Sequence, residues 1–159
     1  MRNYIAHFTL KLEYLFAGLI LESHKEMLIT LGEVIENRSS EVGRHALRVS
    51  LFCHYLALKA GLSLAEADLL KLVSPIHDVG KVAVSDSILF KSGKVTPDEF
   101  EKIKLHSSFG YEVFKNSNTQ IMQAAAIVAR QHHEHWDGGG YPQGLKGKEI
   151  HIFGKVKFA

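Results

Sequence analysis

The sequence predicts an all-α protein, a helical bundle with one long glycine-rich loop, and three observations support this. Apolar residues recur at steps of three and four along most of the 159 residues, which is the spacing of amphipathic helices. Residue patterns that begin helices precede several of these stretches. Only Val82–Val84 resembles a strand, and so short a segment cannot found a sheet.

The first two helices are predicted from their apolar stripes. Residues 12–35 carry leucine, phenylalanine, isoleucine and valine at helical spacing. Ser39 and Ser40 can cap a second helix, which is expected to end at Gly61 because glycine favours the turn after a helix.

Capping signals predict the later helices. Ser63 and Glu66 have the spacing of a capping box, and so do Thr96 and Glu99, with Pro97 at the first helical position. A further helix is expected over 119–133. Residues 134–148 are rich in glycine and predict a loop, after which a helix is expected near Ile150. Loops of this length in compact domains are usually functional.

Composition limits the function classes. The chain is 46% hydrophobic and 23% charged, as expected for one ordinary globular domain, and its net charge of +2 gives no basic footprint for a nucleic acid polymer or an anionic membrane. The single cysteine, Cys53, excludes a disulfide within the chain and fits a reducing compartment. The apolar run over 14–21 is too short to span a membrane.

Histidine is unusually frequent, with ten residues, and it is the commonest metal ligand in proteins. Glu41 and His45 are four apart, so they share one face of a helix. Each histidine alone is more often a surface or core residue than a ligand. Together, imidazoles and carboxylates without thiolates suit iron, manganese or zinc, and if they converge they are too many for one ion. The candidate ligands are Glu41, His45, His77, Asp78, His106, His132 and His133.

Two strings of residues resemble a known family, the HD-GYP domain. The family is a branch of the HD hydrolase superfamily whose activity is hydrolysis of cyclic di-GMP, and the resemblance runs from about Glu33 to the end of the chain. The strings occur in the family's order and read His77-Asp78-Val79-Gly80-Lys81 and His132-His133-Glu134-His135-Trp136-Asp137-Gly138-Gly139-Gly140-Tyr141-Pro142.

The resemblance implies roles for particular residues. The five histidines named above and Asp78 match the family's metal ligands, and Glu41 matches a carboxylate of members that hold three metal ions rather than two. Lys81 matches a lysine that contacts the substrate phosphate and bridging solvent, so Asp78 and Lys81 are the expected catalytic residues. Gly140, Tyr141 and Pro142 match the loop that borders the substrate. The same loop is proposed to meet GGDEF domains, the cyclases that make this nucleotide.

The implied activity is metal-dependent hydrolysis of cyclic di-GMP to linear pGpG, with GMP as a further product left open. Two or three divalent ions, iron or manganese first, and a bacterial cytoplasmic location are expected. Two alternatives stay open: a non-catalytic module that binds a cyclic dinucleotide or a GGDEF partner, and a phosphohydrolase acting on another nucleotide. For the loop alone, the alternative is a plain turn with Trp136 and Tyr141 packed as lids on the core.

The sequence also departs from the family. Members place one more metal-ligating aspartate after the glycine-rich loop, in the helix that is expected to begin near Ile150, and no acid occurs over 153–159. We therefore expect a core that lacks its C-terminal helices and has impaired activity. Residues 1–36 are predicted to form a helical connector and residues 37–159 the metal-binding core. The connector's apolar stripe either pairs with a second copy in a homodimer or covers the core.

Overall fold

The computed structural model describes residues 18, 22–37 and 45–156. Within these ranges all regular structure is helical, which confirms the predicted all-α class. A helix over 22–36 comes first. The elements that follow are α2 (His45–Lys59), α3 (Leu64–Val73), the 3-10 turns η1 (Ser74–Ile76) and η2 (Val79–Ala83), α4 (Asp86–Leu89), α5 (Pro97–Phe114), α6 (Gln120–Gln131), η3 (Gly147–Glu149) and α7 (Ile152–Lys155).

The predicted helix starts are confirmed where the structure describes them. Ser63 and Glu66 form a reciprocal capping box at α3, and Thr96 and Glu99 form another at α5. The Thr119 hydroxyl accepts the backbone N–H of Met122 and begins α6. Ser39 and Ser40 lie outside the described residues. The strand-like segment Val82–Val84 lies in and directly after η2, where the close packing of Gly80 against α5 sets the backbone conformation.

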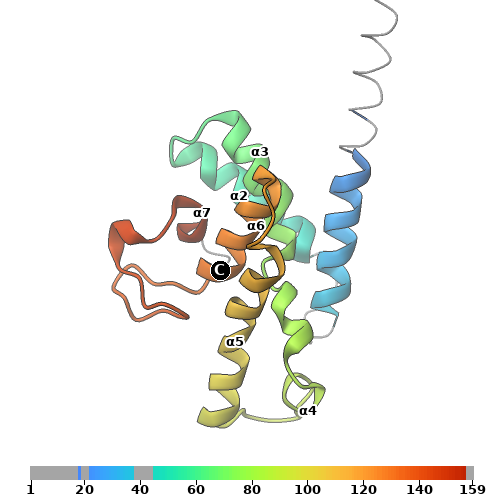
Figure 1. The fold of residues 1–159 in the computed structure, drawn as a ribbon, viewed down its shortest axis with the longest axis vertical. Coiled ribbons are helices and arrows are strands. Elements are labelled where there is room, and N and C mark those ends of the chain that lie inside the picture. The colour runs from blue at the N-terminus through green and yellow to red at the C-terminus, as the bar shows by residue number, and fades with distance from the viewer. Residues whose placement is uncertain (1–17, 19–21, 38–44, 157–159) are drawn as a thin grey trace, which may run out of the picture.

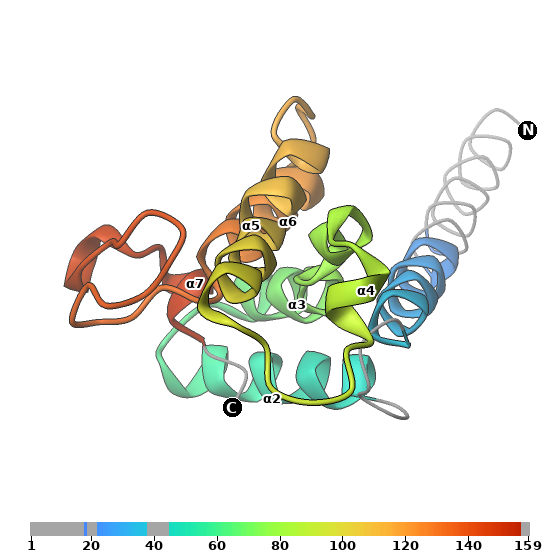
Figure 2. The same cartoon turned by 90° about the horizontal axis from the view of Figure 1, so that it is seen from below.

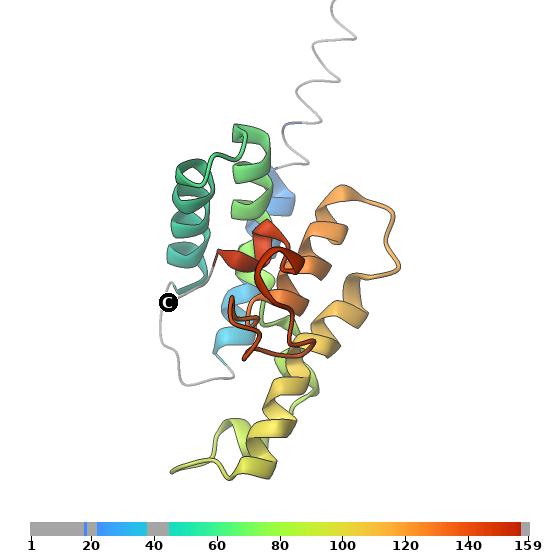
Figure 3. The same ribbon diagram turned by 90° about the vertical axis from the view of Figure 1, so that its left-hand side faces the viewer.

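The helices pack as two pairs. Figure 1 shows α5 rising through the middle of the molecule, with α6 continuing the central layer and the glycine-rich loop to one side. In the view from below, α2 crosses beneath α3, and α5 lies beside α6 (Figure 2). Figure 3 shows α2 and α3 on one side and α5 and α6 on the other, with the loop in front. The core between the pairs contains the fully buried Leu70, Val73, Ile76 and Val128.

The helix over 22–36 joins this core through one face. Leu28 and Ile35 are buried in it, and Gly32 lies against the Pro75 carbonyl, where a Cβ would collide. Met27, Leu31 and Val34 point away from the core and are 65%, 40% and 57% exposed. The predicted division at residue 36 remains a prediction.

Small residues bring the chain segments of the candidate site together. Gly80 in η2 lies so close to α5 that a Cβ there would collide with the His106 carbonyl and approach the Gly110 nitrogen to 2.5 Å. Gly110 in turn faces α6, where an added Cβ would lie 3.0 Å from the Ala129 Cβ. This close approach is what places the residues after η1 beside His106.

Replacing Gly80 with alanine is expected to lower the free energy of unfolding by about 3 kcal/mol or more, because the new methyl group meets backbone rather than flexible side chains. Urea denaturation measures the loss. The matched control is Gly18→Ala in an exposed helical position, where a Cβ would meet no described atom within 4 Å. That variant is expected to be neutral or slightly more stable. Equal stability of the two variants would contradict the close packing of η2.

Candidate metal centre

Four ligand side chains converge between η2, α5 and α6. Asp78 lies between η1 and η2, His106 is in α5, His132 caps the C-terminal end of α6, and His133 follows it. One ligand atom of each lies within 4.8 Å of those of the other three. Asp78, His106 and His132 are buried and His133 is half-buried. We call these residues the four-residue cluster.

The two central imidazoles are held by backbone carbonyls. His106 Nδ1 lies 2.6 Å from the Ile103 carbonyl oxygen, and His132 Nδ1 lies 3.0 Å from that of Ala129. A carbonyl only accepts hydrogen bonds, so Nδ1 must carry the proton in each ring. In the neutral ring Nε2 then presents a lone pair, and the two Nε2 atoms face each other at 3.1 Å. Two lone pairs at this distance repel unless a cation lies between or beside them.

Asp78 presents its two oxygens to different neighbours. Oδ1 lies 3.1 Å from His106 Nε2 and 3.5 Å from His132 Nε2, yet accepts no well-directed hydrogen bond from the described residues. Oδ2 lies 3.2 Å from His77 Nε2 and 2.7 Å from Lys81 Nζ. The carboxylate can therefore contribute to two adjacent cation positions, one on each oxygen.

These residues fit a divalent metal ion. The buried Asp78 Oδ1 accepts no hydrogen bond from the described residues and therefore favours a positive partner, and the neighbouring imidazole nitrogens can act as ligands to it. The Ser107 hydroxyl also lies 3.4 Å from His106 Nε2. Backbone carbonyls that fix the Nδ1 proton are the support usually found behind metal-ligating histidines. His77 has the same support, with Nδ1 2.9 Å from the Ser74 carbonyl oxygen.

The glycine-rich loop folds back onto this cluster. The Tyr141 ring stacks on His133, with centroids 4.5 Å apart and planes at 22°. The Tyr141 N–H donates to the His133 carbonyl at 3.1 Å. A Cβ at Gly140 would collide with the backbone of residues 133–135, so only glycine fits there. Tyr141 packs on the imidazoles of the cluster and Trp136 is 64% exposed, so neither ring packs as the lid on the core that the alternative for the loop describes.

The Glu134 carboxylate fixes the glycine-rich loop by two hydrogen bonds to its backbone. Its side chain is almost fully buried, with 1% exposed. Oε1 accepts the N–H of Gln143 and Oε2 that of Leu145, each at 2.8 Å. Both oxygens of one carboxylate thus fix the backbone on the far side of Tyr141 and Pro142.

Comparison with known proteins decides the family. The sequence pattern that defines the HD domain matches residues 29–156. The chain belongs to the HD-domain family. The HD domain is 45% identical over 135 residues to a 3'3'-cGAMP-specific phosphodiesterase 2 of Vibrio cholerae, covering 85% of this chain and 26% of that protein. It is 40% identical to a cyclic di-GMP phosphodiesterase of Thermotoga maritima, covering 82% and 36%.

A third relative is a cyclic di-GMP phosphodiesterase response regulator of Xanthomonas campestris, 37% identical over 85% of this chain and 36% of the relative. The HD domain therefore spans between about a quarter and a little over a third of the length of these relatives. None of the helices in the described part of the chain combines the length and apolar character needed to cross a bilayer.

Burial and neighbouring charges shift the pKa values of the histidines in the HD domain in different directions. It lowers the pKa of His132 to about 4 and, with charge repulsion from neighbouring imidazoles, that of His133 to about 2. Burial also acts to lower the pKa of His77, but the adjacent Asp78 carboxylate outweighs it and raises that pKa. Burial acts to raise the pKa of Asp78, yet His77 and the other imidazoles hold it well below its usual range. Asp78 is therefore an anion and His132 and His133 are neutral near pH 7.

The metal-free HD domain is expected to lose stability as the pH falls from about 6.5 toward 4, since unfolded histidines titrate near 6.5. His132 and His133 take up protons in the unfolded chain and not in the folded one. His77 acts in the opposite direction, because its raised pKa stabilises the fold below that value. Burial and the nearby Lys155 ammonium also lower the pKa of His151. Three lowered histidines therefore oppose one raised histidine and give a net loss of stability, which urea denaturation at pH 7 and pH 5 would measure. A midpoint that stays equal or rises at pH 5 would contradict this.

The structure brings together some predicted site residues and leaves others apart. Asp78, His106, His132 and His133 form the cluster, and His77 and Lys81 contact Asp78. His45 begins α2, is half-buried and stands outside the four-residue cluster. Glu41 lies outside the described residues. Sequence reasoning assigned no role to Glu134, although an acid directly after the paired histidines was a visible signal.

Proposed function

We propose that this HD domain is a metal-dependent phosphodiesterase that hydrolyses a cyclic dinucleotide, cyclic di-GMP first. The observation that supports the proposal most strongly is the pair of buried Nε2 lone pairs that face each other beside an unsatisfied oxygen of Asp78. Burying such groups without a cation raises the free energy of the folded state, whereas with a cation they become its ligands.

Asp78, His106, His132 and His133 would hold one ion. Oδ2 of Asp78 and His77 would contribute to a second, with His45 and Glu41 as further ligands predicted from the sequence. Iron and manganese suit this donor set. Bound there, the ions supply an activated water and neutralise phosphoryl oxygens. Their identity and number, two or three, are part of the proposal.

Other side chains act on the substrate directly. Lys81 lies 2.7 Å from Asp78 Oδ2 and is half-buried, so its ammonium can donate to a phosphate oxygen at the edge of the cluster. Gly140, Tyr141 and Pro142 are proposed to border the substrate, since the Tyr141 ring stacks on His133 and meets His106. Asp78 and Lys81 remain the proposed catalytic residues.

The names of the relatives point to two candidate substrates for this chain. Cyclic di-GMP stands in the names of the Thermotoga and Xanthomonas relatives, and 3'3'-cGAMP in that of the Vibrio relative at 45% identity. The two nucleotides differ in one base only. We therefore propose cyclic di-GMP as the substrate and 3'3'-cGAMP as the second candidate, with linear pGpG, and GMP beyond it, as products of the first.

The test is hydrolysis by the chain loaded anaerobically with manganese or iron, with products separated by chromatography and metal content measured on the same sample. Metal-dependent cleavage of either nucleotide that His132→Ala abolishes would support the proposal. The low activity expected from the sequence stays a prediction, so metal content is the primary readout. A folded chain that holds no metal would overturn the proposal. Tight binding of the nucleotide without turnover in a metal-loaded chain would favour the non-catalytic binding module instead.

We also propose that the helix over 22–36 pairs with a second copy. Met27, Leu31 and Val34 follow a four-three spacing on its exposed side, the pattern of a two-helix seam. Light scattering should give twice the chain mass, and Leu31→Glu should return it to the monomer. Docking of a GGDEF domain on the loop and a bacterial cytoplasmic location belong to the same proposal. The free, buried Cys53 agrees with a reducing compartment.

A further inference from the structure

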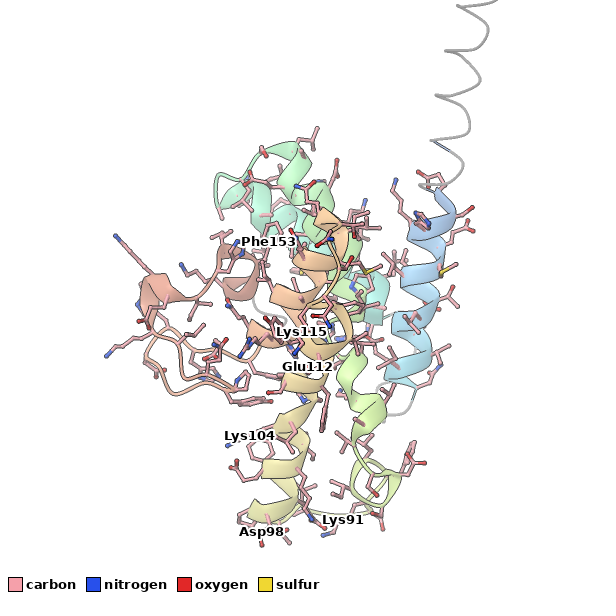
Figure 4. The ribbon with its side chains drawn as sticks, in the orientation of Figure 1. Lys91, Asp98, Lys104, Glu112, Lys115 and Phe153 are labelled. Atoms are coloured by element: carbon pink, nitrogen blue, oxygen red, sulfur yellow. The ribbon has the colours of Figure 1, made fainter. Side chains whose placement is uncertain are left out.

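An ammonium group lies over two aromatic rings next to the four-residue cluster. Lys104 Nζ is 5.1 Å from the centroid of Phe100 and 5.7 Å from that of Tyr141. The two rings meet edge to face with centroids 6.4 Å apart. Phe100 and Lys104 are four residues apart on α5, one turn apart on the same side. Figure 4 shows Lys104 on the side of α5 that the glycine-rich loop occupies.

This arrangement is open to a ligand. Phe100 is 42% exposed and the Lys104 side chain is 28% exposed. Lys104 pairs with Glu101 at 2.6 Å, but that carboxylate is 69% exposed, and surface pairs of this kind contribute little and exchange readily. A phosphate could therefore replace Glu101 as the partner of Lys104.

The position relative to the cluster is fixed by one shared ring. The Tyr141 ring contacts Phe100 and Lys104, stacks on His133 and also meets the ring of His106. A ligand whose phosphate lies at the cluster therefore extends its next group over Phe100 and Lys104. In a cyclic dinucleotide a base and a second phosphate follow the first phosphate around the ring, so one or both can reach this neighbouring position.

Resting on the proposed function, we propose that Phe100, Lys104 and Tyr141 form a nucleoside subsite, here named the Lys104 platform. The platform binds the half of the cyclic dinucleotide that is not being cleaved. A base stacks on the exposed part of Phe100, and Lys104 donates to the second phosphate. Stacking on an aromatic side chain accepts any base, so the platform contributes affinity for cyclic dinucleotides as a class. These are substrate-binding residues and take no part in metal binding.

The experiment measures the dissociation constant of a hydrolysis-resistant phosphorothioate analogue of cyclic di-GMP, together with metal content. Phe100→Leu is expected to weaken binding about tenfold, in line with the loss of one stacked base. Lys104→Gln is expected to weaken it several-fold and to reduce its salt dependence, and Lys104→Arg should restore most of the binding because it keeps the charge.

Matched controls come from the same surface. Lys115 pairs with Glu112 at 2.6 Å three residues apart, as Lys104 does with Glu101, but it lies at the C-terminal end of α5 (Figure 4). Phe90 is 57% exposed at the end of α4. Lys115→Gln and Phe90→Leu should bind the analogue like the wild type.

The outcomes separate the two proposals. Weaker binding by the platform variants with unchanged metal content supports the platform. Wild-type affinity in both platform variants overturns it and leaves the metal-dependent function standing. A wild-type chain that loads metal but does not bind the analogue overturns the platform together with the proposed substrate. A chain that holds no metal overturns the proposed function.

Discussion

Asp78→Asn is expected to remove bound metal from the HD domain and to lower any phosphodiesterase activity by more than about 100-fold, which exceeds the usual cost of losing a supporting group behind a metal ligand. Asparagine has nearly the same shape, but it is neutral and has one oxygen. It can no longer present an anionic oxygen to His106 and His132 on one side and another to His77 on the other. Elemental analysis after loading with manganese measures the loss.

The control is His24→Ala, which removes an exposed histidine from the helix over 22–36 and should leave metal content unchanged. Circular dichroism must show both variants folded, since Asp78 is buried among charged and polar partners. An Asp78→Asn variant that binds as much manganese as the wild type would mean that the cluster is a structural hydrogen-bond network.

Local signals made the helices predictable. The capping boxes at Ser63 and Thr96 involve only residues three positions apart, so they can be predicted without knowing the tertiary fold. The end of α3 was less predictable because the chain continues directly into η1, without the glycine or loop that usually marks a helix end. The valines after Asp78 have strand propensity, yet tertiary packing of Gly80 against α5 decides their conformation.

The sequence predicts which residues belong to the candidate site, but it does not predict how their side chains are oriented. The two His-containing strings identify Asp78, His132 and His133, and their resemblance to one family implies His106. That the rings of His106 and His132 turn their Nε2 atoms toward each other depends on carbonyls of Ile103 and Ala129, which no residue pattern reveals. Burial is equally invisible: Glu134 lies in a polar, glycine-rich stretch that suggests solvent exposure.

The position of Lys104 was hidden for a related reason. Its spacing from Phe100 can be seen in the sequence, but such a pair usually lies on a solvated helix face. Its contact with Tyr141 arises only because the loop folds back over α5. Residues that share a helix can be paired from sequence, whereas residues that meet across elements require the fold.

Glu134→Gln is expected to lower the free energy of unfolding by about 2 kcal/mol, since hydrogen bonds to a charged group contribute about 1.5–3 kcal/mol each. Both carboxylate oxygens accept backbone N–H groups, from Gln143 and Leu145. The amide of glutamine replaces one acceptor with a donor, which then faces an N–H group in a buried position. The loop between these two bonds should lose its fixed place, and with it the stacking of Tyr141 on His133.

Different hydrogen bonds position the loop and the four-residue cluster, so the Glu134→Gln variant should disturb the loop and leave metal binding intact. Metal content is expected to stay near that of the wild type, because Glu134 contacts none of the carbonyls that orient His106 and His132. Affinity for the cyclic di-GMP analogue is expected to fall about tenfold or more, as one well-placed aromatic contact and its neighbours are lost. Glu149→Gln is the matched control: that carboxylate also accepts a backbone N–H in the loop region, from Lys146 at 2.9 Å, but in an exposed position. Equal stability and equal nucleotide affinity of the Glu134 and Glu149 variants would show that the buried carboxylate does not position the loop.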